Sequence, residues 1–178
     1  MPSTRQRALD AAVSVVSEHG MRALTHARID AAAGLPRGST SNSFRTRSAL
    51  IEGLIDWIAE GERTDLPAYD FADADSFISA LTRLIEVQTT EHAERTKARF
   101  TLFLEADAAA LAPLRAQRRR FEEWMASAAG ALHMTDAPAA ARTLLACGSG
   151  LVMHRLTVDP DVAVRPVVER AVRGCLAV

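Results

Sequence analysis

The residues of this chain best suited to hydrogen-bond chemistry lie in one short polar segment, residues 37–43. Arginine can donate two hydrogen bonds to O6 and N7 of guanine, and asparagine can pair with N6 and N7 of adenine, so Arg37 and Asn42 are candidate base readers. Three serines add hydroxyl groups for bases or phosphates: Ser39, Ser41 and Ser43. Since the segment has no large apolar side chain, a helix formed there has a face free to contact DNA.

The residues before this segment predict a helix-turn-helix. Thr25 is a good N-cap, because its hydroxyl can accept from an amide that the first turn of a helix leaves unpaired. Gly34 ends that helix, since glycine reaches positive φ without steric cost, and Pro36 suits the first position of the next helix. We expect the second helix to span Pro36–Ser43 and to enter the DNA major groove.

Charge is distributed unevenly along the chain. Residues 1–50 hold seven arginines against three acidic residues, a net charge of +4, whereas residues 51–178 hold 14 basic and 19 acidic residues, a net charge of −5. A basic amino-terminal module on an acidic body is typical of a DNA-binding protein with a separate second domain, and chance clustering is the alternative. We expect Thr25, His26 and Arg47 to contact phosphates and fix the register on DNA.

A recurring order of residues runs through the first fifty positions. The matching residues are Ala12, Glu18, Gly20, Leu24, Thr25, Ile29, Ala33, Gly34, Gly38, Ser39, Phe44, Arg47, Ala49 and Leu50. In this order they resemble the N-terminal domain of the TetR family of bacterial transcriptional regulators. That family has a helix ending in Glu-x-Gly, then Thr, Ile-Ala, Ala-Gly, a Gly-Thr/Ser-Leu-Tyr run, Phe, and Lys before a hydrophobic pair.

Three residues depart from the family pattern. Asp30 replaces the usual Ala, which we interpret as a surface or packing change. Ser41 replaces an aromatic residue that commonly contacts a phosphate, so that contact is in question. Arg47 replaces Lys and keeps the charge. The resemblance is strong over residues 5–54 and rests beyond them on an all-helical pattern of suitable length.

The chain is expected to be all-α, with a three-helix DNA-binding domain at 1–47 and a helical effector-binding and dimerisation domain at 48–178. Thr46 can cap a helix in which apolar residues repeat with the helical period, and a connection is expected at 65–75. Further helices are expected at about 75–92 and 93–106, and another begins at Pro113. A helix capped by Asp136 should run to about Leu156, and a last helix should follow the Asp159-Pro160 turn and extend to the end.

By resemblance, the second domain binds a small, largely apolar effector and forms a dimer. The candidate effector residues are bulky side chains, for which plain core packing is the alternative: Trp57, Phe100, Phe103, Trp124 and Met125. The last two helices would pair across a two-fold axis, with ordinary packing inside one subunit as the alternative. The candidate dimer residues are Leu144, Gly148, Leu151, Val152, Val168 and Val172.

Catalytic and metal chemistry have little support. The five histidines are scattered and have no ligand spacing with the two cysteines, and the chain has no glycine-rich phosphate loop. We therefore expect no enzyme activity, no metal site and no cofactor. Cys147 and Cys175 are interpreted as buried small residues, with a redox sensor as the alternative.

The sequence also bears on location. The start of the chain leads directly into an amphipathic helix rather than a signal peptide, and the longest uncharged runs, 124–135 and 143–153, are shorter than the roughly 20 residues that span a bilayer. We expect a cytoplasmic protein without membrane contact.

Together these expectations describe a homodimeric, effector-released transcriptional repressor that binds a palindromic operator in double-stranded DNA. The alternative is a helical small-molecule-binding protein whose DNA-binding head is vestigial, which the missing aromatic at Ser41 supports.

Overall fold

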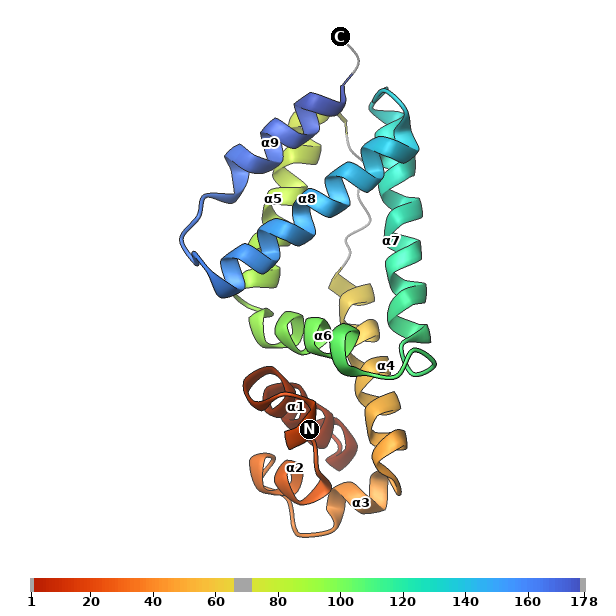
Figure 1. The fold of residues 1–178 in the computed structure, drawn as a ribbon, viewed down its shortest axis with the longest axis vertical. Coiled ribbons are helices and arrows are strands. Elements are labelled where there is room, and N and C mark those ends of the chain that lie inside the picture. The colour runs from red at the N-terminus through yellow and green to blue at the C-terminus, as the bar shows by residue number, and fades with distance from the viewer. Residues whose placement is uncertain (1, 66–71, 177–178) are drawn as a thin grey trace. The chain divides into compact units, whose positions relative to one another are not determined.

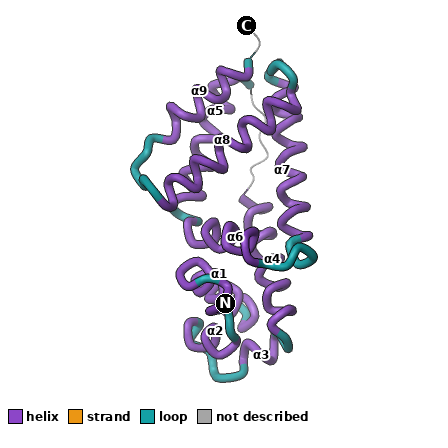
Figure 2. The backbone as a smooth tube through the Cα atoms, in the orientation of Figure 1, coloured by secondary structure: helices purple, strands orange, loops and turns teal. Residues whose placement is uncertain are grey.

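The computed structural model describes residues 2–65 and 72–176, and these residues are helical throughout their regular structure (Figure 1). The all-α prediction is confirmed, since the described part of the chain contains no strand (Figure 2). The elements are α1 Thr4–His19, a 3-10 turn Met21–Ala23, α2 His26–Ala32, α3 Ser39–Ser43, α4 Arg47–Asp65, α5 Ala74–Thr89, α6 Ala93–Glu105, α7 Ala112–Ala131, α8 Ala137–Thr157 and α9 Val164–Cys175. None of these helices is long and apolar enough to cross a membrane.

The chain forms two compact units that do not follow its linear order. The first unit combines residues 1–66 with 94–117, and the second combines 67–93 with 118–178. The first unit extends beyond residue 47 because α1, α4 and α6 share one apolar core, to which Leu9, Leu54 and Leu102 contribute. The expected boundary at 47/48 divides the chain by function and stays a prediction.

Helix ends follow the capping residues expected from the sequence. The Thr25 hydroxyl accepts from the Arg28 amide at 3.3 Å, and the Thr46 hydroxyl accepts from the Ala49 amide at 3.1 Å. The Asp136 carboxylate accepts from the Ala139 amide at 3.2 Å at the start of α8. Asp73 caps α5, which begins at Ala74, close to the expected start at about 75. Most of the expected connection at 65–75 lies outside the described residues.

The second helix of the helix-turn-helix is shorter than expected. It spans Ser39–Ser43 instead of Pro36–Ser43, so the prediction of its start was wrong. Gly38 has a φ of 89°, a left-handed conformation through which a right-handed helix does not pass. Arg37 therefore lies in the turn that precedes the helix. Gly34 has the positive φ expected of it, 60°.

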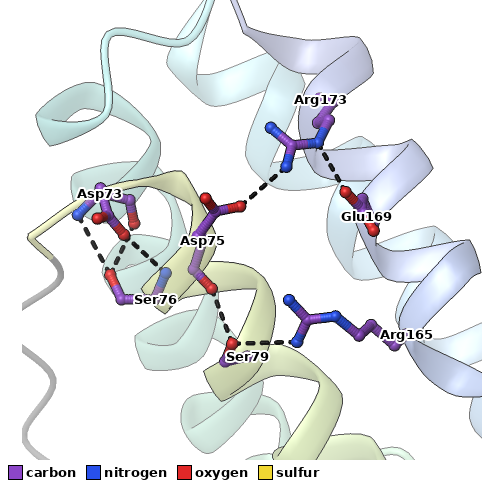
Figure 3. A network of polar contacts seen from close by, with 7 residues as sticks. All are labelled: Asp73, Asp75, Ser76, Ser79, Arg165, Glu169 and Arg173. Carbon is purple, nitrogen blue, oxygen red and sulfur yellow. Dashed lines mark hydrogen bonds and ion pairs between the residues drawn. The ribbon is translucent and has the colours of Figure 1, made fainter.

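In the second unit, α5 contacts both α8 and α9. A valine stripe of α9, Val164, Val168 and Val172, is buried there. At the edge of this contact, Arg173 bridges Asp75 of α5 at 2.8 Å and Glu169 of its own helix at 2.9 Å (Figure 3). Arg165 donates to the Ser79 hydroxyl at 3.1 Å in the same view. The face of α9 that carries the three valines therefore packs against helices of its own subunit.

Candidate nucleic-acid interface

Asp30 joins the two helices of the helix-turn-helix. The side chain comes from α2, is only 3% exposed and accepts three hydrogen bonds from the start of α3. Oδ2 accepts from the Gly38 amide at 2.8 Å, while Oδ1 accepts from the Thr40 amide at 2.8 Å and the Thr40 hydroxyl at 2.6 Å. The residue expected to be a surface or packing change is therefore a buried acceptor.

The same contacts set the protonation of Asp30. Burial alone would raise the pKa of this carboxyl group, because it disfavours the charged form. The Thr40 hydroxyl, the Thr40 and Gly38 amides and the His26 side chain all favour the carboxylate, and their combined effect lowers the pKa below its ordinary value. Asp30 is therefore ionised at neutral pH.

This lowered pKa predicts an acid-sensitive contribution to stability. A carboxyl group whose pKa is lower in the folded state stabilises the protein fully above its unfolded pKa, about 3.9, and loses that contribution as pH falls through the folded value. Asp30→Ala should lower the free energy of unfolding by roughly 1.5–3 kcal/mol at pH 7, the range for hydrogen bonds to a charged group. Urea unfolding at pH 7 and at pH 3 should show the gap between variant and wild type shrinking in acid; an equal gap at both pH values would contradict this.

Thr25 and His26 lie at the start of α2, and their side chains make different hydrogen bonds. Thr25 is exposed and its hydroxyl oxygen accepts the capping bond, which leaves its proton free to donate to a phosphate. His26 Nε2 lies 2.7 Å from the Phe44 carbonyl oxygen, so Nε2 carries the proton and donates to it. His26 therefore ties α2 to the end of α3, and only its other nitrogen is available to DNA.

In the recognition segment, residues 37–43, some polar side chains bond to the backbone and others make no hydrogen bond with the described residues. The Ser39 hydroxyl donates to the Pro36 carbonyl at 2.6 Å, and the Ser41 hydroxyl donates to the Gly38 carbonyl at 2.9 Å. Their remaining lone pairs suit the amino groups of bases better than phosphates, because phosphates only accept. Asn42 is exposed and its side chain makes no hydrogen bond with the described residues.

The arginines of the first fifty residues fall into two groups. Three support the fold: Arg5 lies over the Phe44 ring at 4.3 Å, Arg7 donates to the Ala33 carbonyl at 2.8 Å, and Arg47 donates to the Met21 carbonyl at 2.8 Å. The others are exposed, and their side chains make no ion pair or hydrogen bond with the described part of the chain: Arg22, Arg28, Arg37 and Arg45. Of these four, only Arg37 was predicted from its sequence context, although the excess of arginine in residues 1–50 was a signal for all four.

Arg47→Ala is expected to weaken binding to specific and random DNA alike. The substitution should reduce the magnitude of the slope of log K against log[salt] by about 1 per subunit, because one phosphate contact is lost. Arg47→Lys, which keeps the charge but not the planar donor to Met21, is the matched control and should keep the slope. Titrations at several salt concentrations measure it, and an unchanged slope in Arg47→Ala would remove Arg47 from the interface.

The five candidate effector residues are divided between the two units. In the first unit, the Trp57 indole donates to the Asp10 carboxylate at 3.0 Å, the Phe100 ring lies 5.1 Å from the Arg99 guanidinium, and Phe103 is 36% exposed. In the second unit, Trp124 stacks on Phe121 at 5.4 Å between ring centroids, and Met125 is buried. Within each unit the structure therefore groups only part of the set.

The candidate dimer residues lie inside the second unit. Five of them are at most 7% exposed: Leu144, Leu151, Val152, Val168 and Val172. A Cβ atom added at Gly148 would lie 3.7 Å from Ile85 Cδ1, so this glycine also faces its own subunit. The exposed residues of α8 and α9 include Ala146, Gly150, Met153, Arg170 and Gly174.

The two cysteines lie on α8 and at the end of α9. Cys147 and Cys175 are free thiols. Burial, and secondly the neighbouring Cys147, raise the pKa of Cys175, which favours its less reactive protonated form. No group of His, Cys, Asp and Glu among the described residues has the arrangement of a metal site.

Comparisons with known proteins agree with this fold. A transcriptional regulator from Rhodococcus sp. Rha1 superposes with a TM-score of 0.82 at 13% identity, covering 97% of this chain and 96% of that one. A TetR family member from Streptomyces coelicolor A3 has a TM-score of 0.71 at 24% identity, covering 99% and 100%. The multidrug binding protein EbrR, solved with ethidium, has a TM-score of 0.67 at 25% identity, covering 99% and 100%.

Sequence comparison gives the family. No curated protein sequence matches the chain. A family model described as "Tetracyclin repressor-like, C-terminal domain" matches residues 72–178, which is more than half of the chain. Together with the helix-turn-helix at its amino terminus, this match shows that the chain belongs to the TetR family of transcriptional regulators.

Proposed function

We propose that this protein is a homodimeric repressor that binds a near-palindromic operator through residues 1–47 and is released by a small-molecule effector bound within residues 48–178. The observation that carries the proposal is the outward-facing recognition segment, in which Arg37 and Asn42 are exposed and unengaged by the described residues. Base edges in the major groove are the partners that these two side chains match. Four exposed arginines of the head, Arg22, Arg28, Arg37 and Arg45, add the positive charge that binding to DNA phosphates requires.

The effector is expected to be small and largely apolar. Trp124, Phe121 and Phe77 form a contiguous aromatic group in the second unit, with ring centroids 5.4 and 6.4 Å apart. Two structural relatives are described in relation to drugs. EbrR is a multidrug binding protein solved with ethidium, and NalD is the secondary repressor of a multidrug efflux pump in Pseudomonas aeruginosa. An effector that favours a conformation unable to bind DNA would release the operator by shifting that equilibrium.

The dimer is proposed to form through the outer faces of α8 and α9. Ala146, Gly150 and Met153 form one exposed line along α8, because their spacing follows the helical turn. A Cβ atom added at Gly150 or Gly174 would meet no atom of the subunit within 4 Å. Small residues with open space above them allow a partner helix to approach closely.

A gel shift with the DNA that flanks the protein's own gene tests the function. We expect a discrete complex on that DNA and an affinity that falls steeply with salt, because phosphate counterions are released. Malachite green, with which EbrR was also solved, serves as the probe effector and should release the complex. Binding of malachite green without any DNA complex at low salt would favour the alternative, a small-molecule-binding protein with a vestigial head.

A further inference from the structure

We propose that Asp30 is the positioning residue of the DNA-binding head: it sets the recognition segment against the base pairs without touching DNA. This inference rests on the proposed function, since it concerns how the same head reads its operator. Asp30 belongs to α2, whereas both candidate base readers, Arg37 and Asn42, belong to the recognition segment. A single buried carboxylate therefore connects the helix that anchors to phosphates with the segment that reads bases.

The contact is built from three short hydrogen bonds, two of which join buried groups. Asp30 is 3% exposed and Thr40 is completely buried. The two carboxylate oxygens accept from the Gly38 amide, the Thr40 amide and the Thr40 hydroxyl at 2.6–2.8 Å. Because the carboxylate is buried, its geometry is fixed by the protein and no part of it is available to DNA.

The short helix α3 needs such a partner. It has five residues, and its N-cap is Gly38, which has no side chain to satisfy the unpaired amides of the first turn. A helix of this length is unstable by itself, since nucleation is costly and few bonds repay it. Asp30 supplies the missing cap from the preceding helix, and its negative charge also suits the positive end of α3.

The groups of Gly38 and Thr40 that bond to Asp30 lie close in the chain to the two candidate base readers. Arg37 precedes Gly38 in the chain, and the backbone N–H of Asn42 donates to the backbone carbonyl of Gly38 at 2.9 Å. A shift of Gly38 and Thr40 would therefore move both readers together. Because bidentate base contacts require close placement, such a shift should remove sequence preference while leaving the exposed arginines free to bind phosphates.

The side chains of Asp30 and Thr40 are both polar, and they bond directly to each other at 2.6 Å. The carboxylate also occupies the amides of Gly38 and Thr40, so these groups are not available to a DNA phosphate, and reading depends on side chains.

The test compares sequence preference in variants of the full chain. A duplex enriched by the wild type from a random-sequence library serves as the specific probe, and poly(dI-dC) serves as the non-specific probe. Asp30→Ala should lower the ratio of specific to non-specific affinity by at least about tenfold, the loss expected from a misplaced bidentate contact, with little change on poly(dI-dC). Thr40→Val, which removes only the hydroxyl, should lower the ratio less, and Thr40→Ser should restore it.

The controls separate positioning from charge and from folding. Glu18→Ala removes one exposed carboxylate from the same head and should leave the ratio unchanged. A wild-type ratio in both Asp30→Ala and Thr40→Val would overturn the proposal. A second outcome would also overturn it: Asp30→Ala loses both helicity, measured by circular dichroism, and the ratio of specific to non-specific affinity, while Thr40→Val loses neither. The loss of ratio would then reflect unfolding. Failure of the wild type to enrich any duplex would refute the proposed function, and this inference with it.

Discussion

Gly150→Leu is expected to leave the subunit folded and helical and to shift the protein from dimer to monomer. Gly150 is exposed, and a Cβ atom added there meets no atom of its own subunit within 4 Å, so the subunit has room for a larger side chain. In the proposed interface it would instead push the partner helix away, at about 1–3 kcal/mol per overpacked site. The cost is felt twice, since an isologous interface repeats each contact.

Sedimentation equilibrium measures the oligomeric state, and a gel shift on the operator should show far weaker binding by the monomer, which has one reading head. Gly130→Leu on α7 is the matched control, because Gly130 is also an exposed helical glycine, where an added Cβ atom would make only ordinary contact with Ala137 Cβ at 4.0 Å. The control should remain dimeric. A Gly150→Leu variant that is fully dimeric with wild-type operator affinity would place the interface elsewhere on the subunit.

Arg37→Ala should weaken operator binding by about 1–3 kcal/mol and relax the preference at one base pair in each half-site, because one bidentate contact with guanine is lost. Asn42→Ala should do the same at an adenine. Binding to random DNA should change much less than binding to the operator. Affinity measured on operators with single base changes identifies the position that each side chain reads.

Arg45→Ala is the matched control for Arg37→Ala, because Arg45 is also an exposed, unengaged arginine of the head but lies outside the recognition segment. Its loss should weaken operator and random DNA to the same degree, as expected for a phosphate contact. If Arg37→Ala behaves in the same way as Arg45→Ala, Arg37 contacts phosphates and the base-reading assignment is wrong.

Features that depend on neighbours in the chain could be predicted from the sequence. Thr25, Thr46 and Asp136 cap helices as expected, since a cap involves an amide only three residues away. Gly34 adopts the expected positive φ because only its own backbone and the adjacent helix end decide it. The helix-turn-helix and the all-α class follow from such local signals together with the apolar period, and the order of residues in the head indicated the family.

Features that depend on contacts across the chain could not be read from the sequence. Asp30 looked like a surface or packing change until the fold brought it to Gly38 and Thr40, eight and ten residues away. Val168 and Leu151 suited an interface by composition, but an apolar stripe is equally suited to the subunit's own core, and in the structure both are buried there. Apolar burial is non-directional, so a sequence shows which face of a helix is buried but only the tertiary structure decides which neighbour covers it.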